Sequence, residues 1–265
     1  MPFAHSQGCR IYYRLEGVAA RPLVVLVHSL GADHGMWGPQ MPGFLKKFRV
    51  LRLDLRGHGA SDAPDAEYTV AQLSGDVLAA VDAAGYTRFA CCGLSLGGMI
   101  GAWLGANAAD RVTALVLANT SPRMANPDAM NDRRKLVLAE GMQPIEQAVM
   151  ERFFSSSTLA AQNPAEESVR AVMSATNPVG YAGCCSAVRD MNHRALLEKI
   201  KAPVLVIGSD RDASTPWAGH GDVLVAGIAG ARALKLDTAH LSTIEMPEQF
   251  TTGVVDFLCE SLSLS

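Results

Sequence analysis

The sequence predicts an α/β fold built on one doubly wound, mostly parallel sheet, with a helical segment inserted late in the chain. Three observations lead to this prediction. Short runs of continuous apolar residues alternate with amphipathic stretches, as in parallel strands that helices cover on both faces. A G-x-S-x-G motif at residues 93–97 stands between one such run and an amphipathic stretch. Residues 121–201 break the alternation, because helical patterns follow one another there without a convincing strand.

The strands are predicted from the continuous apolar runs. Five such runs are interpreted as buried strands, at residues 23–27, 50–54, 89–92, 112–117 and 204–207. A shorter and more mixed run covers residues 231–236. Residues 9–15 are predicted as an antiparallel start, with Glu16 and Gly17 turning the chain into a return strand.

Helices of the sheet body are predicted where apolar residues recur at helical spacing. Residues 69–84 open with a capping box of Thr69 and Gln72, and residues 98–104 continue the G-x-S-x-G motif as a helix. A further helix is expected to begin at Thr215 and Pro216, an N-cap followed by proline at the first helical position. Residues 247–258 form the last predicted helix.

The interval 121–201 is interpreted as an inserted helical cap, or lid, on a core of residues 1–120 and 202–265. Four helices are expected there, at residues 130–140, 142–154, 166–176 and 181–191. The interval is too long for a structureless loop. The alternative at this point is two further sheet units with weak strands.

Composition narrows the class of protein. The 265 residues include 23 basic and 26 acidic side chains, and 49% of them are hydrophobic, which excludes a disordered chain. There is no basic segment for nucleic acid or a membrane surface, no signal-peptide pattern and no apolar run long enough to span a bilayer. We therefore expect a soluble cytoplasmic protein that binds neither nucleic acid nor a membrane.

The cysteines support the same compartment. Six are present, at positions 9, 91, 92, 184, 185 and 259, and two adjacent pairs are poorly suited to disulfides. Reduced thiols are the expected state.

Ser95 is the candidate nucleophile. A buried strand runs into the motif and a helix leaves it, and so sharp a turn leaves the serine in a strained backbone conformation with its hydroxyl exposed. Side chains at positions 93 and 97 would clash in such a turn, which explains the two glycines there.

A serine nucleophile needs a base, and His240 is the preferred one of seven histidines. It follows a late strand and precedes the final helix, as the order serine, acid, histidine requires. His5 and His193 lack a nearby strand end, His58 is assigned to a turn and His220 to the helix after Thr215. His28 ends a buried strand and is expected to make a structural hydrogen bond.

Two aspartates compete for the acid that orients the histidine. Asp210 and Asp212 both follow the strand at 204–207, at the carboxyl end where α/β active sites form. Asp212 is preferred because it clears the strand, while Asp210 is expected to make a local turn hydrogen bond.

The backbone amides of Leu30 and Leu96 are the expected oxyanion donors. Leu96 directly follows the nucleophile, and Leu30 lies in the loop after the strand at 23–27. No metal-binding spacing, nucleotide-binding glycine motif or phosphate-loop lysine is present.

Taken together, the Ser95 motif, the segment 54–61, Asp212 and His240 resemble the α/β-hydrolase superfamily over essentially the whole chain. Segments 29–37, 94–101, 118–121, 180–185, 188–190 and 239–245 more closely resemble the 3-oxoadipate enol-lactone hydrolases of the β-ketoadipate pathway of aromatic compound catabolism. His28 and Met130 depart from that branch, which has asparagine and tryptophan there.

The resemblance implies hydrolysis of 3-oxoadipate enol-lactone to 3-oxoadipate through an acyl-enzyme on Ser95, without a cofactor. A substrate carboxylate would need a cap arginine, and the candidates are Arg123, Arg133, Arg134 and Arg189. The expected apolar walls are Trp37, Met99, Phe153, Phe154 and Trp217.

Other readings remain open at this point. Another capped serine hydrolase, such as a short-chain esterase, a C–C bond hydrolase or a cofactor-free perhydrolase, would carry the same motifs. A non-catalytic binding protein on the same scaffold is a more remote alternative. Aspartate-dependent dehalogenases and epoxide hydrolases are disfavoured by the serine at position 95.

Overall fold

A computed structural model describes residues 2–124, 126–161 and 163–264. Its described residues form one eight-stranded sheet in the order β1-β2-β4-β3-β5-β6-β7-β8. The strands are β1 (Phe3–Ser6), β2 (Cys9–Glu16), β3 (Leu23–Val27), β4 (Arg49–Leu53), β5 (Phe89–Leu94), β6 (Val112–Ala118), β7 (Val204–Gly208) and β8 (Arg232–Lys235). Pairing is antiparallel from β1 through β2 to β4 and parallel across the rest of the sheet. The predicted fold class is confirmed.

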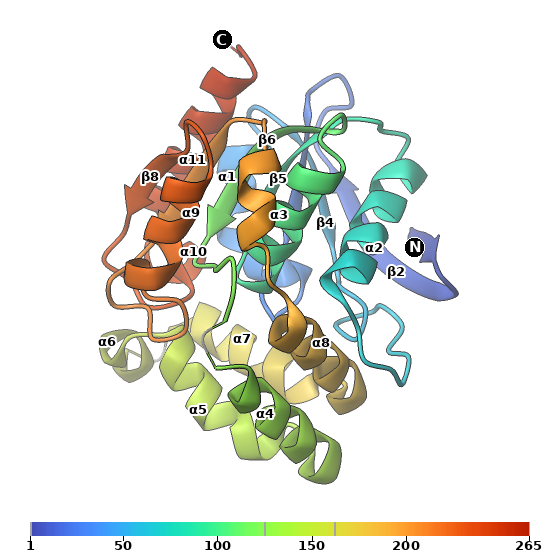
Figure 1. Cartoon of the computed structure of the whole chain (residues 1–265), viewed down its shortest axis with the longest axis vertical. Helices are drawn as coiled ribbons and strands as arrows, with labels where there is room; N and C mark the ends of the chain where they lie inside the picture. Colours follow the sequence, from blue (N-terminus) through green and yellow to red (C-terminus); the bar gives the residue numbers. More distant parts are fainter. Residues whose placement is uncertain (1, 125, 162, 265) are drawn as a thin grey trace.

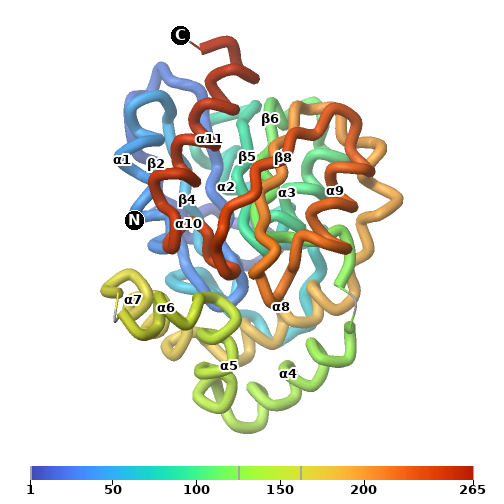
Figure 2. Tube along the Cα trace, turned by 90° about the vertical axis from the view of Figure 1, so that its left-hand side faces the viewer, coloured from blue at the N-terminus to red at the C-terminus, as the bar shows by residue number. Residues whose placement is uncertain are grey.

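Helices cover both faces of this sheet, so its central strands are buried. The helices of the sheet body are α1 (Met41–Phe44), α2 (Val70–Ala83), α3 (Leu96–Asn107), α9 (Asp222–Gly227), α10 (Ser242–Glu245) and α11 (Pro247–Ser261), with 3₁₀ segments η1 (His34–Gln40) and η2 (Arg194–Lys199). Figure 2 shows α3 and α9 on one face of the sheet and α1 and α11 on the other. Every residue of β3, β5 and β7 is buried, as their continuous apolar sequences predict.

The capping box predicted for α2 is present. The Thr69 hydroxyl accepts from the Gln72 amide at 3.1 Å, and the Gln72 side chain accepts from the Thr69 amide at 2.9 Å. Two otherwise unpaired amides at the helix start are thereby satisfied.

The interval 121–201 holds a layer of helices below the carboxyl ends of the strands (Figure 1). These are α4 (Pro127–Glu140), α5 (Gln143–Phe153), α6 (Ser156–Ala160), α7 (Pro164–Ala175) and α8 (Pro178–Asp190), which we call the helical layer. Within the described part of the interval, the β-structure is a bridge between Arg123 and Asn192, where the chain enters and leaves the layer. The alternative of further sheet units is therefore wrong.

Helix α8 sits directly on the sheet body. A Cβ atom on Gly180 would lie 2.2 Å from the Gly57 Cα, so only two glycines permit this approach of the two backbones. Three residues along the helix, the Gly183 carbonyl accepts from the Tyr68 amide at 3.1 Å. The helical layer is thus fixed to the body through backbone contacts of α8.

Two predicted details are wrong. The return strand expected after Gly17 does not pair with β2, because the chain crosses from there to β3. The antiparallel partner of β2 is instead β1, which precedes it in the chain. Gln7 and Gly8, both with positive φ, form the turn between β1 and β2. The expected helix at Thr215 is also absent.

In place of that helix, residues 217–221 form a wide turn, η3 (Trp217–Gly221), with a non-helical backbone at Ala218 and Gly219, and α9 begins at Asp222. Thr215 is instead held in the turn after β7, because its backbone amide and its hydroxyl both donate to the Asp212 carboxylate.

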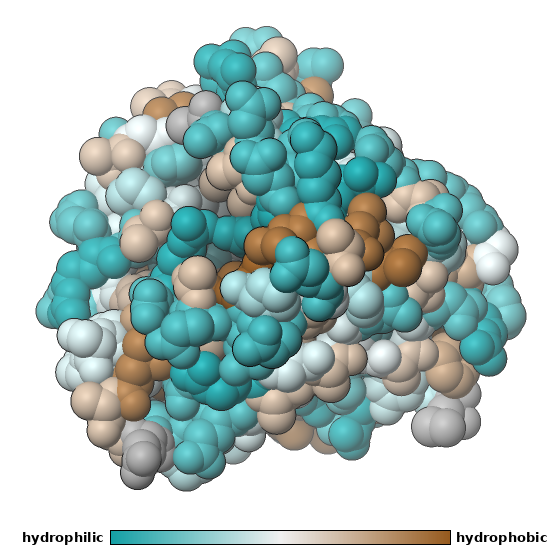
Figure 3. Space-filling view, turned by 90° about the horizontal axis from the view of Figure 1, so that it is seen from below, coloured by the Kyte–Doolittle hydropathy of each residue, from teal (hydrophilic) through white to brown (hydrophobic). Residues whose placement is uncertain are grey.

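The surface seen from the side of the helical layer is mostly hydrophilic, with a band of apolar atoms across its middle (Figure 3). Among the described residues, none of the helices combines the length and the apolar character that crossing a lipid bilayer requires. All six cysteines are unpaired, as predicted.

Candidate active site

Ser95 occupies a strained turn between β5 and α3. Its backbone has φ +57° and ψ −115°, a region that side chains other than glycine rarely adopt. A Cβ atom on Gly93 would lie 2.1 Å from the Gly97 carbonyl oxygen, and one on Gly97 would lie 2.0 Å from that of Val27. The clashes predicted for positions 93 and 97 are therefore real, and glycine is required at both.

Neighbouring residues hold the Ser95 backbone but leave its hydroxyl unbound. The Ser95 amide donates to the Ala118 carbonyl of β6 at 2.9 Å, and the Thr120 hydroxyl donates to the Ser95 carbonyl at 2.7 Å. Within the described chain the Ser95 side chain has no hydrogen-bond partner, and it lines a cavity of about 290 Å³.

Asp212 lies at the end of β7 and is 1% exposed. Its carboxylate accepts hydrogen bonds from the backbone amides of Ser214 and Thr215, from the Thr215 hydroxyl and from the side chains of Asn119 and His240, at 2.8 to 3.0 Å. Burial alone would raise the pKa of Asp212, but the charge and hydrogen bond of His240 and the other donors hold that pKa well below its usual range. The carboxylate is therefore ionised at neutral pH.

Asp210, the competing aspartate, is oriented differently. It is largely exposed and pairs with Lys235 of β8 at 2.5 Å. Of the two aspartates, only Asp212 contacts a histidine of the cavity.

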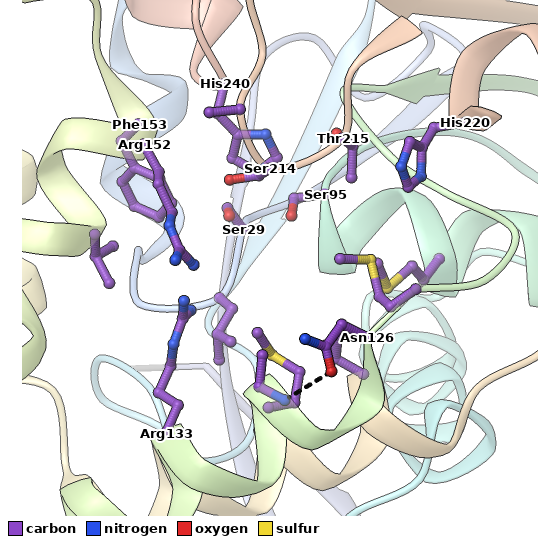
Figure 4. A pocket seen from close by; sticks show the side chains of 18 of the residues that line it. Ser29, Ser95, Asn126, Arg133, Arg152, Phe153, Ser214, Thr215, His220 and His240 are labelled. Atoms are coloured by element: carbon purple, nitrogen blue, oxygen red, sulfur yellow. Dashed lines mark hydrogen bonds between the residues drawn. The ribbon is translucent and has the colours of Figure 1, made fainter. Parts of the chain in front are cut away.

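His240 lies between Asp212 and the cavity. Its Nδ1 is 2.8 Å from the Asp212 Oδ2, and its ring stacks on Phe153 of α5 with centroids 5.7 Å apart. In Figure 4 the imidazole is directed toward the hydroxyls of Ser95 and Ser29. Because a carboxylate only accepts, Nδ1 carries hydrogen and the other ring nitrogen is available to the cavity.

The amides of Leu30 and Leu96 are free to bind an anion. Leu96 is the first residue of α3, and Leu30 lies in the loop after β3 and lines the cavity. Neither amide has an acceptor in the part of the chain that the structure describes. A helix start with an open amide favours negative charge.

Two buried histidines fix the loop that carries Leu30. His28 accepts from the Leu55 amide at 2.9 Å and donates to the Ser29 carbonyl at 2.7 Å, which confirms its predicted structural hydrogen bond. His58 accepts from the Gly31 amide at 3.0 Å. Burial, with the neighbouring His28, lowers the pKa of His58 to about 3, so it stays neutral.

The remaining histidines lie apart from Ser95, with one exception. His5 is exposed on β1, and His193 is buried near the exit of the helical layer. His220, expected on a helix, instead lines the cavity from the turn after β7.

The predicted cavity walls are only partly correct. Met99, Phe153 and Arg133 line the cavity, whereas Trp37, Phe154, Trp217 and Arg123 do not. Trp37 is fully buried against Phe250, and Phe154 is buried with its ring edge-on to that of Phe153, the centroids 6.5 Å apart. Trp217 packs beneath Lys235, and Arg123 is exposed beside its bridge to Asn192.

Two arginines face the cavity from the helical layer. Arg133 of α4 contacts the Tyr181 hydroxyl at 3.4 Å. Arg152 of α5 extends toward Arg133 from the opposite side of the cavity (Figure 4). Burial and the charge of Arg133 lower the pKa of Arg152, and neither arginine pairs with a carboxylate within the described residues. The other candidates are already paired, Arg134 with Glu67 and Arg189 with Glu67 and Asp190.

Several lining residues were missed from the sequence, among them Arg152, Asn126, Tyr181 and His220. Val149, Arg152 and Phe153 are spaced so that they share one face of a helix, and this spacing could have indicated that Arg152 faces the cavity together with Phe153. His220 gave no such signal because its turn is irregular.

One group elsewhere has the residue types of a metal site. Ligand atoms of Asp33, His34 and Asp54 lie within 4.8 Å of one another in the described chain. However, His34 donates to Asp54 at 2.7 Å, and backbone amides of His34 and Ala60 occupy both Asp54 oxygens. The group therefore satisfies itself as a hydrogen-bonded cluster.

Fold and site together define the class. Residues 22–247 match the family model described as alpha/beta hydrolase fold, and the chain belongs to this family. It is an enzyme, a hydrolase of the carboxylic ester or lactone type.

Individual proteins that are similar to this chain carry more specific names than the family does. The chain is 32% identical to 3-oxoadipate enol-lactonase 2 of Acinetobacter baylyi, with 94% of this chain and 93% of that protein covered. The crystal structure of the enol-lactonase from Burkholderia xenovorans superimposes with a TM-score of 0.95 at 39% identity, covering 97% of this chain and 99% of that one. A hydrolase from Pseudomonas aeruginosa superimposes with a TM-score of 0.94 at 42% identity, covering 97% of each chain.

Proposed function

We propose that this hydrolase opens a small lactone that carries a carboxylate, with 3-oxoadipate enol-lactone as the substrate and 3-oxoadipate as the product. The observation that carries the proposal is the cavity itself. Within the described residues, its Ser95 hydroxyl is unbound and its two arginines have no acidic partner, and His240, which is bound to Asp212, faces the same space. The names of the similar proteins support the choice of lactone.

In the proposed acylation step, His240 removes the Ser95 proton while the Ser95 oxygen attacks the lactone carbonyl. The amides of Leu30 and Leu96 stabilise the resulting oxyanion. Asp212 holds the imidazole in the correct tautomer and stabilises its positive charge. The ring C–O bond then breaks and His240 returns the proton to the ring oxygen.

In the deacylation step, His240 takes a proton from water, which attacks the Ser95 ester. The bond between the acyl carbon and the Ser95 oxygen then breaks, and His240 returns its proton to that oxygen. The carboxylate product leaves, and the enol formed by ring opening becomes a ketone. No cofactor takes part in these steps.

We further propose that residues 121–201 act as a cap over a core of residues 1–120 and 202–265. Stacking of Phe153 on His240 supports this role, because α5 thereby covers the imidazole and excludes water from one side of it. Unpaired cysteines in every position agree with a reducing, cytoplasmic location.

The direct test is turnover of 3-oxoadipate enol-lactone beside p-nitrophenyl acetate by the purified protein. We expect kcat/KM for the lactone to exceed that for the ester. Brisk ester cleavage with slow lactone turnover would instead indicate a short-chain esterase.

The arginines provide a sharper prediction about the carboxylate. Arg133→Gln and Arg152→Gln are each expected to lower kcat/KM for the enol-lactone by about 10- to 100-fold, because a buried carboxylate would lose a charged hydrogen bond. Turnover of uncharged p-nitrophenyl acetate should change by less than about threefold, since these bonds concern only the carboxylate.

Arg134→Gln is the matched control, since Arg134 is the next residue on α4 but pairs with Glu67. It should leave both substrates nearly unaffected. Equal losses on the lactone and the neutral ester in the Arg133 and Arg152 variants would contradict a carboxylate-binding role.

A further inference from the structure

Glu245, the last residue of α10, links the helical layer to the loop that carries His240. Its side chain is half-buried, and its carboxylate accepts four hydrogen bonds. Oε1 accepts from the Ser155 amide at 2.8 Å, from the Ser155 hydroxyl at 2.6 Å and from the Thr158 hydroxyl at 2.5 Å. Oε2 accepts from the Ala239 amide at 2.5 Å. One carboxylate therefore binds the start of α6 with one oxygen and the backbone next to His240 with the other.

The same two segments meet at a second contact. The Leu241 amide donates to the Phe153 carbonyl at 3.0 Å, and the Phe153 ring stacks on His240. The backbone on both sides of His240 is thus tied to the end of α5, on one side directly and on the other through Glu245. Arg152, the residue before Phe153, extends into the cavity from this end of α5 (Figure 4). These contacts fix where the Arg152 side chain starts relative to His240.

A carboxylate is the side-chain group that suits these four donors. Two of them are backbone amides, from Ser155 and Ala239, which cannot turn away, whereas the two hydroxyls can. An amide side chain has a single acceptor oxygen, and its NH₂ group only donates. In Glu245→Gln, whichever way the amide is turned, its NH₂ group faces one of the two backbone amides. The substitution therefore breaks one of the two connections while it preserves the shape of the side chain.

The proposed substrate has to reach both segments at once. Its carboxylate is expected to meet the arginines while its carbonyl lies at Ser95, within reach of His240. Binding energy at a remote group accelerates a reaction only where it holds the reacting atoms in the right place. The position of Arg152 relative to His240 therefore matters for a carboxylate-bearing lactone. It matters much less for a neutral ester, which has no group for the arginines to bind.

We propose that Glu245 is a positioning residue that fixes Arg152 relative to His240, so that the bound carboxylate orients the lactone carbonyl for attack by Ser95. The proposal rests on the proposed lactone hydrolysis. Glu245 is not among the described residues that line the cavity, and it acts through the two segments that it joins. It takes no part in proton transfer.

The test compares 3-oxoadipate enol-lactone with neutral p-nitrophenyl acetate in Glu245→Gln. We expect kcat for the lactone to fall about tenfold with KM changed by less than about twofold, because the carboxylate still binds but the carbonyl is less well placed. Turnover of p-nitrophenyl acetate should fall by less than about threefold, since His240 keeps its bond to Asp212. Rates are expressed per active site, counted by titration with a fluorophosphonate, so that unfolded protein does not contribute.

Glu248→Gln is the matched control. Glu248 is exposed in the first turn of α11 and has no hydrogen bond or ion pair within the described chain. Both substrates should be unaffected by this change. Ser155→Ala removes one donor to Glu245 and keeps the carboxylate, so it should show the same pattern with a smaller loss of lactone kcat, about threefold. It carries the test should Glu245→Gln fail to fold.

A double-mutant cycle shows whether Glu245 acts through Arg152. In Arg152→Gln there is no longer an arginine for Glu245 to position. Adding Glu245→Gln to this variant should therefore lower lactone turnover by less than about twofold more. A purely structural role would instead give losses that multiply.

Three results overturn the role of Glu245 alone, provided that the wild type opens the enol-lactone. These are an unchanged lactone kcat in both Glu245→Gln and Ser155→Ala, equal losses on the lactone and the neutral ester per active site, and multiplying losses in the double variant. A wild type that cleaves p-nitrophenyl acetate but does not open the enol-lactone overturns both this role and the proposed function.

Discussion

Ser95→Ala is expected to abolish hydrolysis, with kcat for the enol-lactone and for p-nitrophenyl acetate falling by about 10⁵-fold. The reason is that no other group at the turn between β5 and α3 can form the acyl-enzyme, and loss of a serine nucleophile typically has an effect of this size. A fluorophosphonate probe should label the parent protein and not the variant.

Ser29→Ala is the control for this experiment. Ser29 lines the same cavity, and its hydroxyl has no hydrogen-bond partner in the described part of the chain, so its removal should not disturb the fold. Labelling should persist in this variant. A parent protein that the probe fails to label would favour a non-catalytic binding protein on the same scaffold.

Asp212→Asn is expected to lower kcat by about 10⁴-fold while KM changes little. The amide would present hydrogen to His240, and the imidazole would then adopt the tautomer that cannot accept the serine proton. The matched control is Asp210→Asn, because Asp210 is two residues away and, among the residues that the structure describes, pairs with Lys235 alone. Equal losses in both variants would contradict the assignment of Asp212.

We also expect Asp212→Asn and Asp210→Asn to differ in how their stability depends on pH. Because the folded state holds the pKa of Asp212 below that of the unfolded chain, this carboxylate stabilises the fold above about pH 4, and the contribution is lost as the pH falls further. The free energy of unfolding, measured by urea titration, should therefore depend less on pH below 4 in Asp212→Asn than in Asp210→Asn.

Much of the site could be predicted because its positions follow from the order of the strands. The strand, turn and helix around Ser95 are local, and the carboxyl ends of parallel strands meet at one edge, which brings Asp212 and His240 together. The glycines at 93 and 97 are explained by the same turn.

The cavity walls were harder to predict because packing between helices decides which side chains face inward. Phe153 and Phe154 are adjacent and both buried, yet only Phe153 reaches the cavity. Trp37 is equally apolar but fills the core against Phe250. Thr215 has the sequence of a helix cap, but its amide and its hydroxyl donate instead to the carboxylate of Asp212, three residues earlier in the chain.

The close backbone approach of Gly180 to Gly57 separates two tasks within the helical layer. Helix α8 anchors the layer at this contact, and the end of α5 is held by the Leu241 amide, which donates to the Phe153 carbonyl at 3.0 Å. The side chains of Arg133, Arg152 and Phe153, by contrast, line the cavity from α4 and α5. Substitutions of these cavity-facing side chains can therefore change which molecules the enzyme accepts, while the backbone contacts that attach the layer stay in place. New substrate preferences could therefore arise in this fold while the residues around Ser95 stay the same.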